Sequence, residues 1–212
     1  MRKRSKLEFL KEKIVGVRLL IIFRLTIMDR EKSTHILGLV PGRRVVGFAI
    51  LDKSGLKDFG VKSLRRHKAD SNKMLVINRL LCNIMNYSKP RAVVALKPSL
   101  QKSTSFNLQV ISFIRGLANS RYCPLYFLSI KQIKKVLGGN KALSNQRQLA
   151  QLLKTVYPEL AFYLPDLNSS VISDREKYYQ PLFAAAGLAY SYLKLSEHEH
   201  NKIKEKSEQH CL

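Results

Sequence analysis

Segments of apolar residues separated by short polar turns begin near Thr34. Residues 36–40 are almost entirely apolar, which is typical of a strand buried on both faces, and residues 44–51 form a second apolar segment. The turn Pro41-Gly42 lies between them, and a third segment with loose alternation follows at residues 56–64. The pattern predicts three antiparallel strands joined by short turns.

Helical periodicity begins in the next segment. Apolar residues recur three and four positions apart from Met74 to Ile84, and Asp70 or Ser71 is suited to cap this helix. Pro90 ends it, because proline disfavours the helical conformation of the residue before it. A buried strand, a helix and a further strand follow at residues 92–96, 105–118 and 124–130. This order predicts an α/β fold with a mixed five-stranded sheet, three antiparallel strands and then two alternating with helices, flanked by helices.

The last third of the chain is expected to be mainly helical. A short basic helix at residues 131–137 precedes a second helix at residues 145–157, which Ser144 is expected to cap. After an irregular loop, Pro181 suits the first turn of a final helix at residues 182–195.

These elements predict one domain at residues 34–195 with a segment on either side. Residues 1–33 form a basic N-terminal extension whose apolar part is too short to span a bilayer. We expect an amphipathic extension, and a start near Met28 is the alternative. Residues 196–212 form a polar C-terminal tail that is expected to be frayed or disordered.

The charge balance predicts a domain that binds a polyanion. The chain has 38 Lys and Arg against 15 Asp and Glu, a formal net charge of +23. No Asp or Glu occurs between Asp70 and Glu159, so the middle of the domain carries only cationic charges. Such a surplus attracts nucleic acid, while lysines that only improve solubility are the alternative explanation.

The cysteines favour a reducing compartment. Three cysteines, irregularly spaced, suit neither a disulfide framework nor a zinc site. Cys82 and Cys123 lie among apolar residues and are expected to be core thiols, which fits a cytoplasmic protein.

Several segments together resemble the RuvC-type Holliday-junction resolvases of the ribonuclease-H-like superfamily. The segment ILGLVPG at residues 36–42, followed by VVGFAI at residues 45–50, resembles the opening of that family, whose first strand ends in an Asp-Pro-Gly turn. Further similarity lies at residues 90–97, 130–141, 146–153 and 182–190. The resemblance covers about 150 residues in the same order and implies a ribonuclease-H-like fold.

The resemblance also implies four carboxylates that hold two magnesium ions, and this chain lacks them. The corresponding positions are Val40, Leu96 or Lys97, Pro181 and Ala184. Apolar and cationic side chains cannot replace oxygen ligands of Mg²⁺, so the chain is expected to be a pseudo-nuclease without a metal or other cofactor. Lys97 suits a phosphate at the former metal position, or extends into solvent.

Two acids before the final helix leave one catalytic alternative open. Asp174 and Glu176 come close in sequence to the last implied ligand pair. Two acids from one loop do not make a two-metal site, so residual metal-dependent nuclease activity is the less favoured reading.

The expected function is binding of nucleic acid, DNA before RNA, through backbone phosphates. The residues expected to contribute are Arg43, Arg44, Lys97, Lys102, Lys131, Lys134, Lys135, Lys141, Ser144 and Arg147. A protein-interaction or scaffold module on an inactive nuclease fold is the alternative. Its contact surface would be Lys177-Tyr178-Tyr179 with Phe183, bound to a protein partner or a second copy of the chain.

Overall fold

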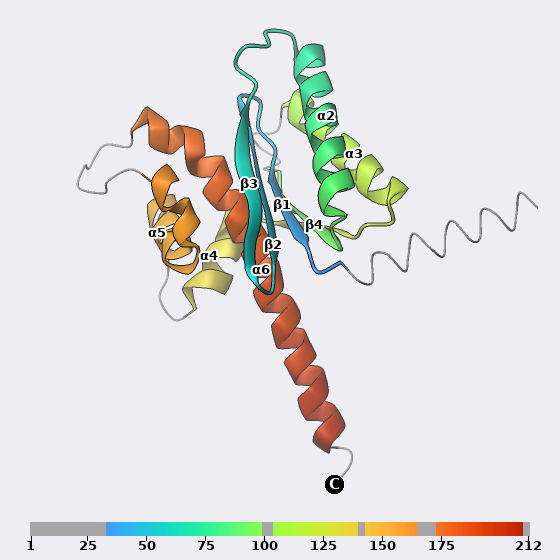
Figure 1. Cartoon of the computed structure of the whole chain (residues 1–212), viewed down its shortest axis with the longest axis vertical. Helices are drawn as coiled ribbons and strands as arrows, with labels where there is room; N and C mark the ends of the chain where they lie inside the picture. The colour runs from blue at the N-terminus through green and yellow to red at the C-terminus, as the bar shows by residue number, and fades with distance from the viewer. Residues whose placement is uncertain (1–32, 99–103, 140–142, 165–172, 210–212) are drawn as a thin grey trace, which may run out of the picture.

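The computed structural model describes residues 33–98, 104–139, 143–164 and 173–209, with side chains up to Glu197 (Figure 1). Almost all of the expected N-terminal extension lies outside these residues, as do Lys102 and Lys141. Within the described part, no helix is long and apolar enough to cross a membrane.

The predicted mixed sheet of five strands is confirmed. Its strands are β1 (Ile36–Val40), β2 (Val45–Asp52), β3 (Gly55–Ser63), β4 (Ala92–Leu96) and β5 (Leu125–Leu128), in the order β3-β2-β1-β4-β5. Strands β1, β2 and β3 pair antiparallel, while β4 pairs parallel to both β1 and β5. Since β1 and β4 are parallel, their carboxyl ends lie at the same edge of the sheet.

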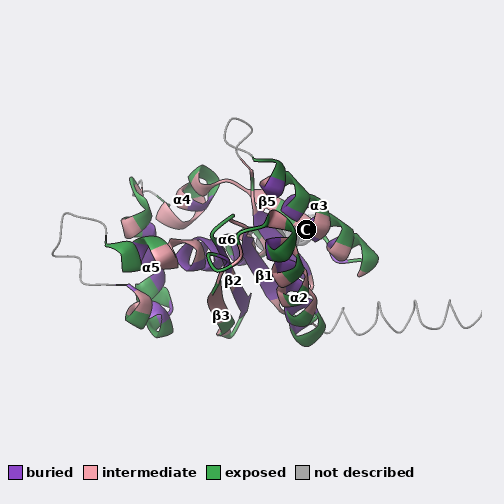
Figure 2. Cartoon of the chain, turned by 90° about the horizontal axis from the view of Figure 1, so that it is seen from above, coloured by how far each residue is buried: buried purple, intermediate pink, exposed green. Residues whose placement is uncertain are grey.

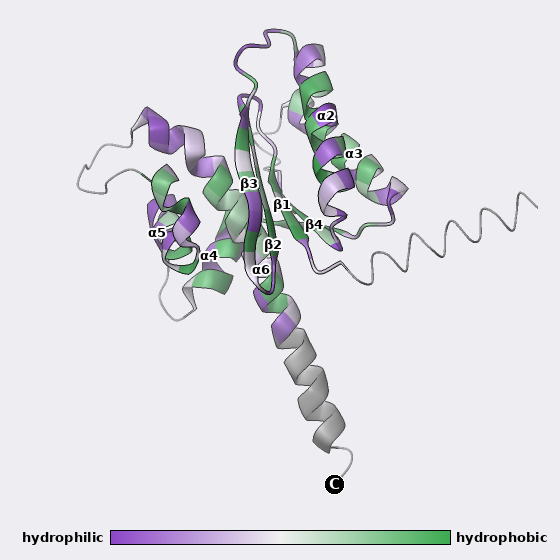
Figure 3. Ribbon diagram, in the orientation of Figure 1, coloured by the Kyte–Doolittle hydropathy of each residue, from purple (hydrophilic) through white to green (hydrophobic). Residues whose placement is uncertain are grey.

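Helices cover both faces of the sheet (Figures 1 and 2). The helices α2 (Asp70–Ser88) and α3 (Ser105–Ser120) pack on one face. The other face carries α4 (Ile130–Gly138), α5 (Gln146–Val156), the 3₁₀ helix η1 (Pro158–Tyr163) and α6 (Asp174–Gln209). The hydrophobic central strands therefore lie between two apolar layers, as their hydropathy indicates (Figure 3).

Side-chain alternation along β1 assigns its residues to the two layers. Val40 belongs to the cluster under α6, while Leu39 belongs to the cluster under α2 and α3. Gly38 and Gly47 let α6 approach the sheet closely. A Cβ at Gly38 would lie 2.9 Å from the Ala185 carbonyl carbon and overlap its oxygen, and one at Gly47 would lie 2.8 Å from the Leu182 nitrogen.

The final helix begins earlier and ends later than predicted. It starts at Asp174, so Pro181 lies inside α6 and not in its first turn. Ser173 marks the start, because its hydroxyl accepts a hydrogen bond from the Glu176 backbone N–H at 3.1 Å. The helix then continues to Gln209, through most of the segment expected to be frayed.

Two predicted helix caps also differ. Ala69 precedes α2 and provides no side-chain cap, so neither Asp70 nor Ser71 has the predicted role. Asn145 caps α5 by accepting a hydrogen bond from the Gln148 N–H at 2.9 Å, in place of the predicted Ser144.

Candidate functional site

The positions where the family resemblance implies metal ligands converge at one edge of the sheet. Val40 ends β1 and Leu96 ends β4, while Ala184 lies on α6 above them. Val40 and Ala184 are buried in one hydrophobic cluster, against which Leu96 packs. Pro181 lies against Gly47, the strand partner of Val40. The positions that the resemblance assigns to metal ligands therefore hold packed apolar residues, and we call Val40, Leu96, Pro181 and Ala184 the apolar layer.

Lys97 lies just outside this layer. Its backbone N–H donates to the Leu128 carbonyl oxygen at 2.9 Å, which extends the pairing of β4 with β5. Its side chain is exposed and forms no hydrogen bond or ion pair with another described residue. The exposure fits an ammonium that extends into solvent.

Glu176 does not face an open pocket, because Arg147 binds it. The Arg147 Nε and Nη2 atoms donate to Oε1 and Oε2 of Glu176 at 2.7 and 2.8 Å, which joins α5 to the start of α6. Hydrogen bonding from Arg147 outweighs desolvation and lowers the pKa of Glu176, which is only 6% exposed. The adjoining cavity, lined in part by Ala184, has a volume of about 10 Å³, room for one water at most.

The contacts of Arg147 and Asp174 bear on their two predicted roles, a phosphate contact and a metal ligand. Arg147 was predicted to contact nucleic acid, but its guanidinium already holds a buried carboxylate. Asp174, the other acid that was considered as a metal ligand, is exposed and pairs with Lys177 at 3.3 Å. Across the described part of the chain, no three His, Cys, Asp or Glu side chains come together.

Two of the residues predicted to contact phosphate, one on α4 and one before α5, bind each other. Lys134 donates from Nζ to the Ser144 carbonyl oxygen at 2.7 Å. Ser144 in turn donates from its backbone N–H and hydroxyl to the Gln148 side chain. Lys131 and Lys135 are exposed on α4 and remain accessible.

A cationic hollow lies beside the turn between β1 and β2. Seven residues line a cavity of about 510 Å³, which we call the turn pocket: Arg43, Arg44, Leu64, Arg65, His67, Lys68 and Lys73. Only Arg43 and Arg44 were singled out from the sequence. The signal for the others was the basic run Arg65-Arg66-His67-Lys68 in the connection between β3 and α2.

The β2–β3 hairpin positions these residues. The Leu64 N–H donates to the Arg44 carbonyl oxygen at 2.8 Å, which brings the end of β3 beside the start of β2. Asp70 then bridges Arg43 and Lys73, at 3.2 Å from Arg43 Nη2 and 2.8 Å from Lys73 Nζ. The hydrogen bond from Lys73, with the one from Arg43, lowers the pKa of Asp70.

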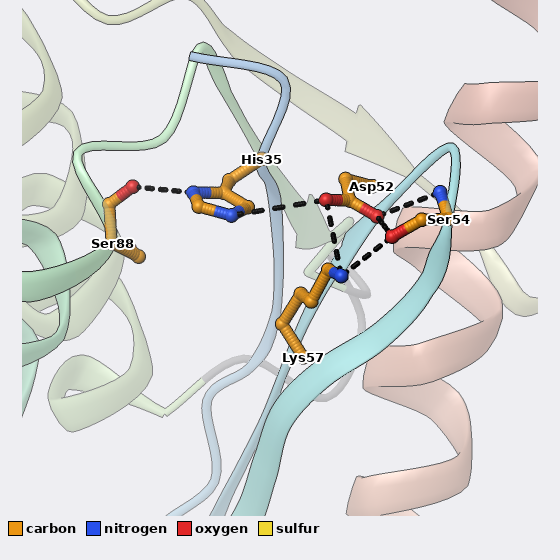
Figure 4. Close-up of polar contacts among 5 residues, drawn as sticks. All are labelled: His35, Asp52, Ser54, Lys57 and Ser88. Atoms are coloured by element: carbon orange, nitrogen blue, oxygen red, sulfur yellow. Dashed lines mark hydrogen bonds and ion pairs between the residues drawn. The ribbon is translucent and has the colours of Figure 1, made fainter.

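A network of polar contacts lies at the amino end of β1, opposite to the turn pocket (Figure 4). His35 Nδ1 lies 3.0 Å from the Ser88 carbonyl oxygen, and Nε2 lies 3.9 Å from Asp52. Burial opposes ionisation of Asp52, but hydrogen bonds from Ser54 and the charge of Lys57 outweigh it and lower the pKa of Asp52. His35 thus connects the start of β1 with α2 and the β2–β3 hairpin.

The aromatic residues proposed as a protein-contact surface are largely packed. Phe183 is buried in the core. Tyr178 and Tyr179 are half-buried, and Tyr179 contacts the ring of Tyr163 edge to face, with a centroid distance of 4.9 Å. Phe162, which was not predicted as part of this surface, is exposed and contacts the ring of Tyr163.

Comparison with solved structures shows the fold that this geometry indicates. RuvC of Thermus thermophilus in complex with a Holliday junction substrate has a TM-score of 0.58 and 13% identity, over 78% of this chain and 96% of that one. The yeast mitochondrial Holliday junction resolvase has a TM-score of 0.53 and 15% identity, over 86% and 90%. No protein-family profile and no curated protein matches the sequence. At these identities the comparison establishes a RuvC-like fold.

Proposed function

We propose that this chain is a RuvC-like protein that binds nucleic acid without cleaving it, and that DNA is its ligand in preference to RNA. The observation that carries the proposal is the apolar layer: at positions that the resemblance assigns to metal ligands, Val40 and Ala184 are buried in one hydrophobic cluster and Leu96 packs against that cluster. A two-metal nuclease needs several carboxylate oxygens around its ions, and apolar side chains supply none.

The charge of the chain supports retention of binding. Cations outnumber acids by 23, and the accessible ones include Arg44, Lys131 and Lys135. Lys and Arg contacts to backbone phosphates are largely independent of base sequence. One of the structures that share this fold has a DNA junction bound, which favours DNA as the first ligand to test.

The test combines a binding assay with a cleavage assay on the full chain. Fluorescence anisotropy with labelled duplex, junction and single-stranded DNA should show binding at low salt. Its affinity should fall by about 10³-fold or more between about 50 and 200 mM salt if six or more phosphates are neutralised. Absence of binding at low salt would refute the proposal.

Cleavage is tested on the same substrates with Mg²⁺ or Mn²⁺. We expect intact DNA after prolonged incubation. Cleavage that Asp174→Ala abolishes would instead assign a displaced metal site to the start of α6. Lys131→Glu combined with Lys135→Glu, both exposed on α4, should weaken DNA binding and leave the thermal unfolding temperature close to that of the wild-type chain.

A further inference from the structure

We propose that the turn pocket binds a phosphate group, and that it does so on the α2 side of the sheet, away from the apolar layer. Five cationic side chains line it: Arg43, Arg44, Arg65, Lys68 and Lys73. They come from three segments, the β1–β2 turn, the β3–α2 connection and the first turn of α2. For DNA or RNA as the source of the phosphate, the inference rests on the proposed function.

The cations of the turn pocket are incompletely neutralised. Among the residues that the structure describes, Asp70 is the one carboxylate bonded to them, and it pairs with Arg43 and Lys73. Arg44, Arg65 and Lys68 form no side-chain hydrogen bond or ion pair with any other described residue. Like charges held around one hollow repel one another, and a bound anion removes that repulsion.

The backbone at the start of α2 adds donors to the same place. Lys68 precedes this helix and Lys73 lies in its first turn with Asp70, while Ala69 provides no side-chain cap for the N–H groups. A helix N-terminus without a capping side chain retains free N–H groups and a partial positive charge. Here these groups lie next to the arginines and lysines that line the cavity.

The chemistry of the lining suits an oxyanion such as phosphate. Arginine presents several N–H donors in a planar fork that binds two oxygens of one phosphate, and three arginines line the cavity. Lys73, only 8% exposed, supplies a fixed charge at the wall, held in place by Asp70. The volume of about 510 Å³ accommodates a phosphate together with part of a sugar or a second phosphate.

A second hollow continues from the turn pocket along α2. His67 lines both cavities, and the second, of about 420 Å³, also includes Lys62 and Arg79. Leu64 at the turn pocket belongs to the core layer under α2, whereas Val40 belongs to the layer under α6. A nucleic-acid backbone bound here would therefore follow α2 and the edge strand β3, on the face opposite to α6.

Two matched charge reversals test the assignment. Arg44 and Lys53 lie just outside opposite ends of β2, both exposed and without an ion pair among the described residues. Arg44→Glu and Lys53→Glu change the net charge equally, and only Arg44 lines the turn pocket. Binding of a labelled oligonucleotide and of inorganic tripolyphosphate is measured for the full chain by anisotropy and calorimetry, with circular dichroism to confirm folding. Lys68→Glu serves as a second pocket variant.

We expect Arg44→Glu and Lys68→Glu to weaken oligonucleotide binding by about tenfold or more. The slope of log affinity against log salt concentration should fall in magnitude by about 1. Lys53→Glu should change the oligonucleotide affinity by less than about twofold. Loss of tripolyphosphate binding in the pocket variants would assign a site that also takes free polyphosphate. If these variants weaken only oligonucleotide binding, the phosphate must belong to a polynucleotide.

Equal effects of Arg44→Glu and Lys53→Glu would overturn the inference and leave the proposed function standing. If the wild-type chain binds tripolyphosphate through Arg44 but no oligonucleotide, the proposed function fails and the pocket remains. Binding of neither ligand would refute both.

Discussion

Replacement of Gly38 by alanine tests the contact between α6 and the sheet. Gly38 lies in the middle of β1, where an added Cβ would overlap the Ala185 carbonyl oxygen and come within 3.2 Å of the Ala189 Cβ. The nearest atoms belong to the backbone of α6, so no side-chain rotation can relieve the overlap. The helix must move away from the strand, which opens gaps around its neighbours.

The expected loss in the free energy of unfolding is about 2 to 3 kcal/mol. Overpacking in a tight core costs about 1 to 3 kcal/mol, and a clash with backbone belongs at the upper end of that range. The lower entropy of the unfolded alanine chain returns about 0.4 to 1 kcal/mol of this. Gly47→Ala should behave similarly, because its Cβ would meet Pro181 and Leu182 of the same helix.

Urea denaturation of Gly38→Ala measures the effect, with Gly116→Ala as the matched control. Gly116 lies in α3, where an added Cβ meets no atom within 4 Å. The control should therefore be more stable than the wild-type chain by about 0.5 to 1 kcal/mol, the helix-propensity difference. If Gly38→Ala is as stable as the wild-type chain, α6 does not lie against β1 as described, and the apolar layer loses its basis.

Three further substitutions probe the charges and the apolar layer. Glu176→Gln should lower the thermal unfolding temperature near neutral pH, because it removes the charge that Arg147 binds. The pKa of Glu176 in the folded state lies below its ordinary value of 4.5, so the ion pair stabilises the fold above pH 4.5. This stabilisation is lost as the pH falls through the folded pKa. The difference in unfolding temperature between the variant and the wild-type chain should therefore shrink when unfolding is measured at acidic pH. Asp70→Asn should tighten tripolyphosphate binding in calorimetry, because it removes the carboxylate that occupies Arg43 and Lys73; unchanged or weaker binding would contradict this. Val40→Asp should cost about 3 kcal/mol or more in urea denaturation, since it buries an unpaired carboxylate at a site 8% exposed; a smaller loss would mean that this edge of the sheet is open to solvent.

The central strands and the sheet could be predicted from sequence because their pattern has few alternatives. Residues 36–40 and 92–96 are continuously apolar, which fits only elements buried on both faces, and both are strands over the predicted residues. The start of α6 was placed too late because Pro181 is a familiar first-turn residue. Ser173 followed three residues later by Glu176 is a common sequence at helix starts, and the helix begins there.

The contacts that define the candidate sites depend on tertiary structure. Arg147 and Glu176 are 29 positions apart, and the basic sequence around Arg147 equally suits a phosphate contact. The turn pocket arises because the hairpin folds Leu64 back beside Arg44. Sequence alone shows two separate basic segments and no reason for them to meet. Charge counting thus predicts the class of ligand but not the place where it binds.

The two proposals, no metal chemistry and binding of phosphate, are compatible with one another because they concern opposite faces of the sheet. The apolar layer is part of the packing of α6: Val40 and Ala184 lie in the same cluster as Leu182 and Leu188. The turn pocket depends instead on the layer under α2, which contains Leu64. An apolar residue at the end of β1 adds to the packing under α6 and does not touch the layer that contains Leu64. The apolar residues at the end of β1 therefore do not preclude phosphate contacts at the turn pocket, and each proposal can be tested without the other.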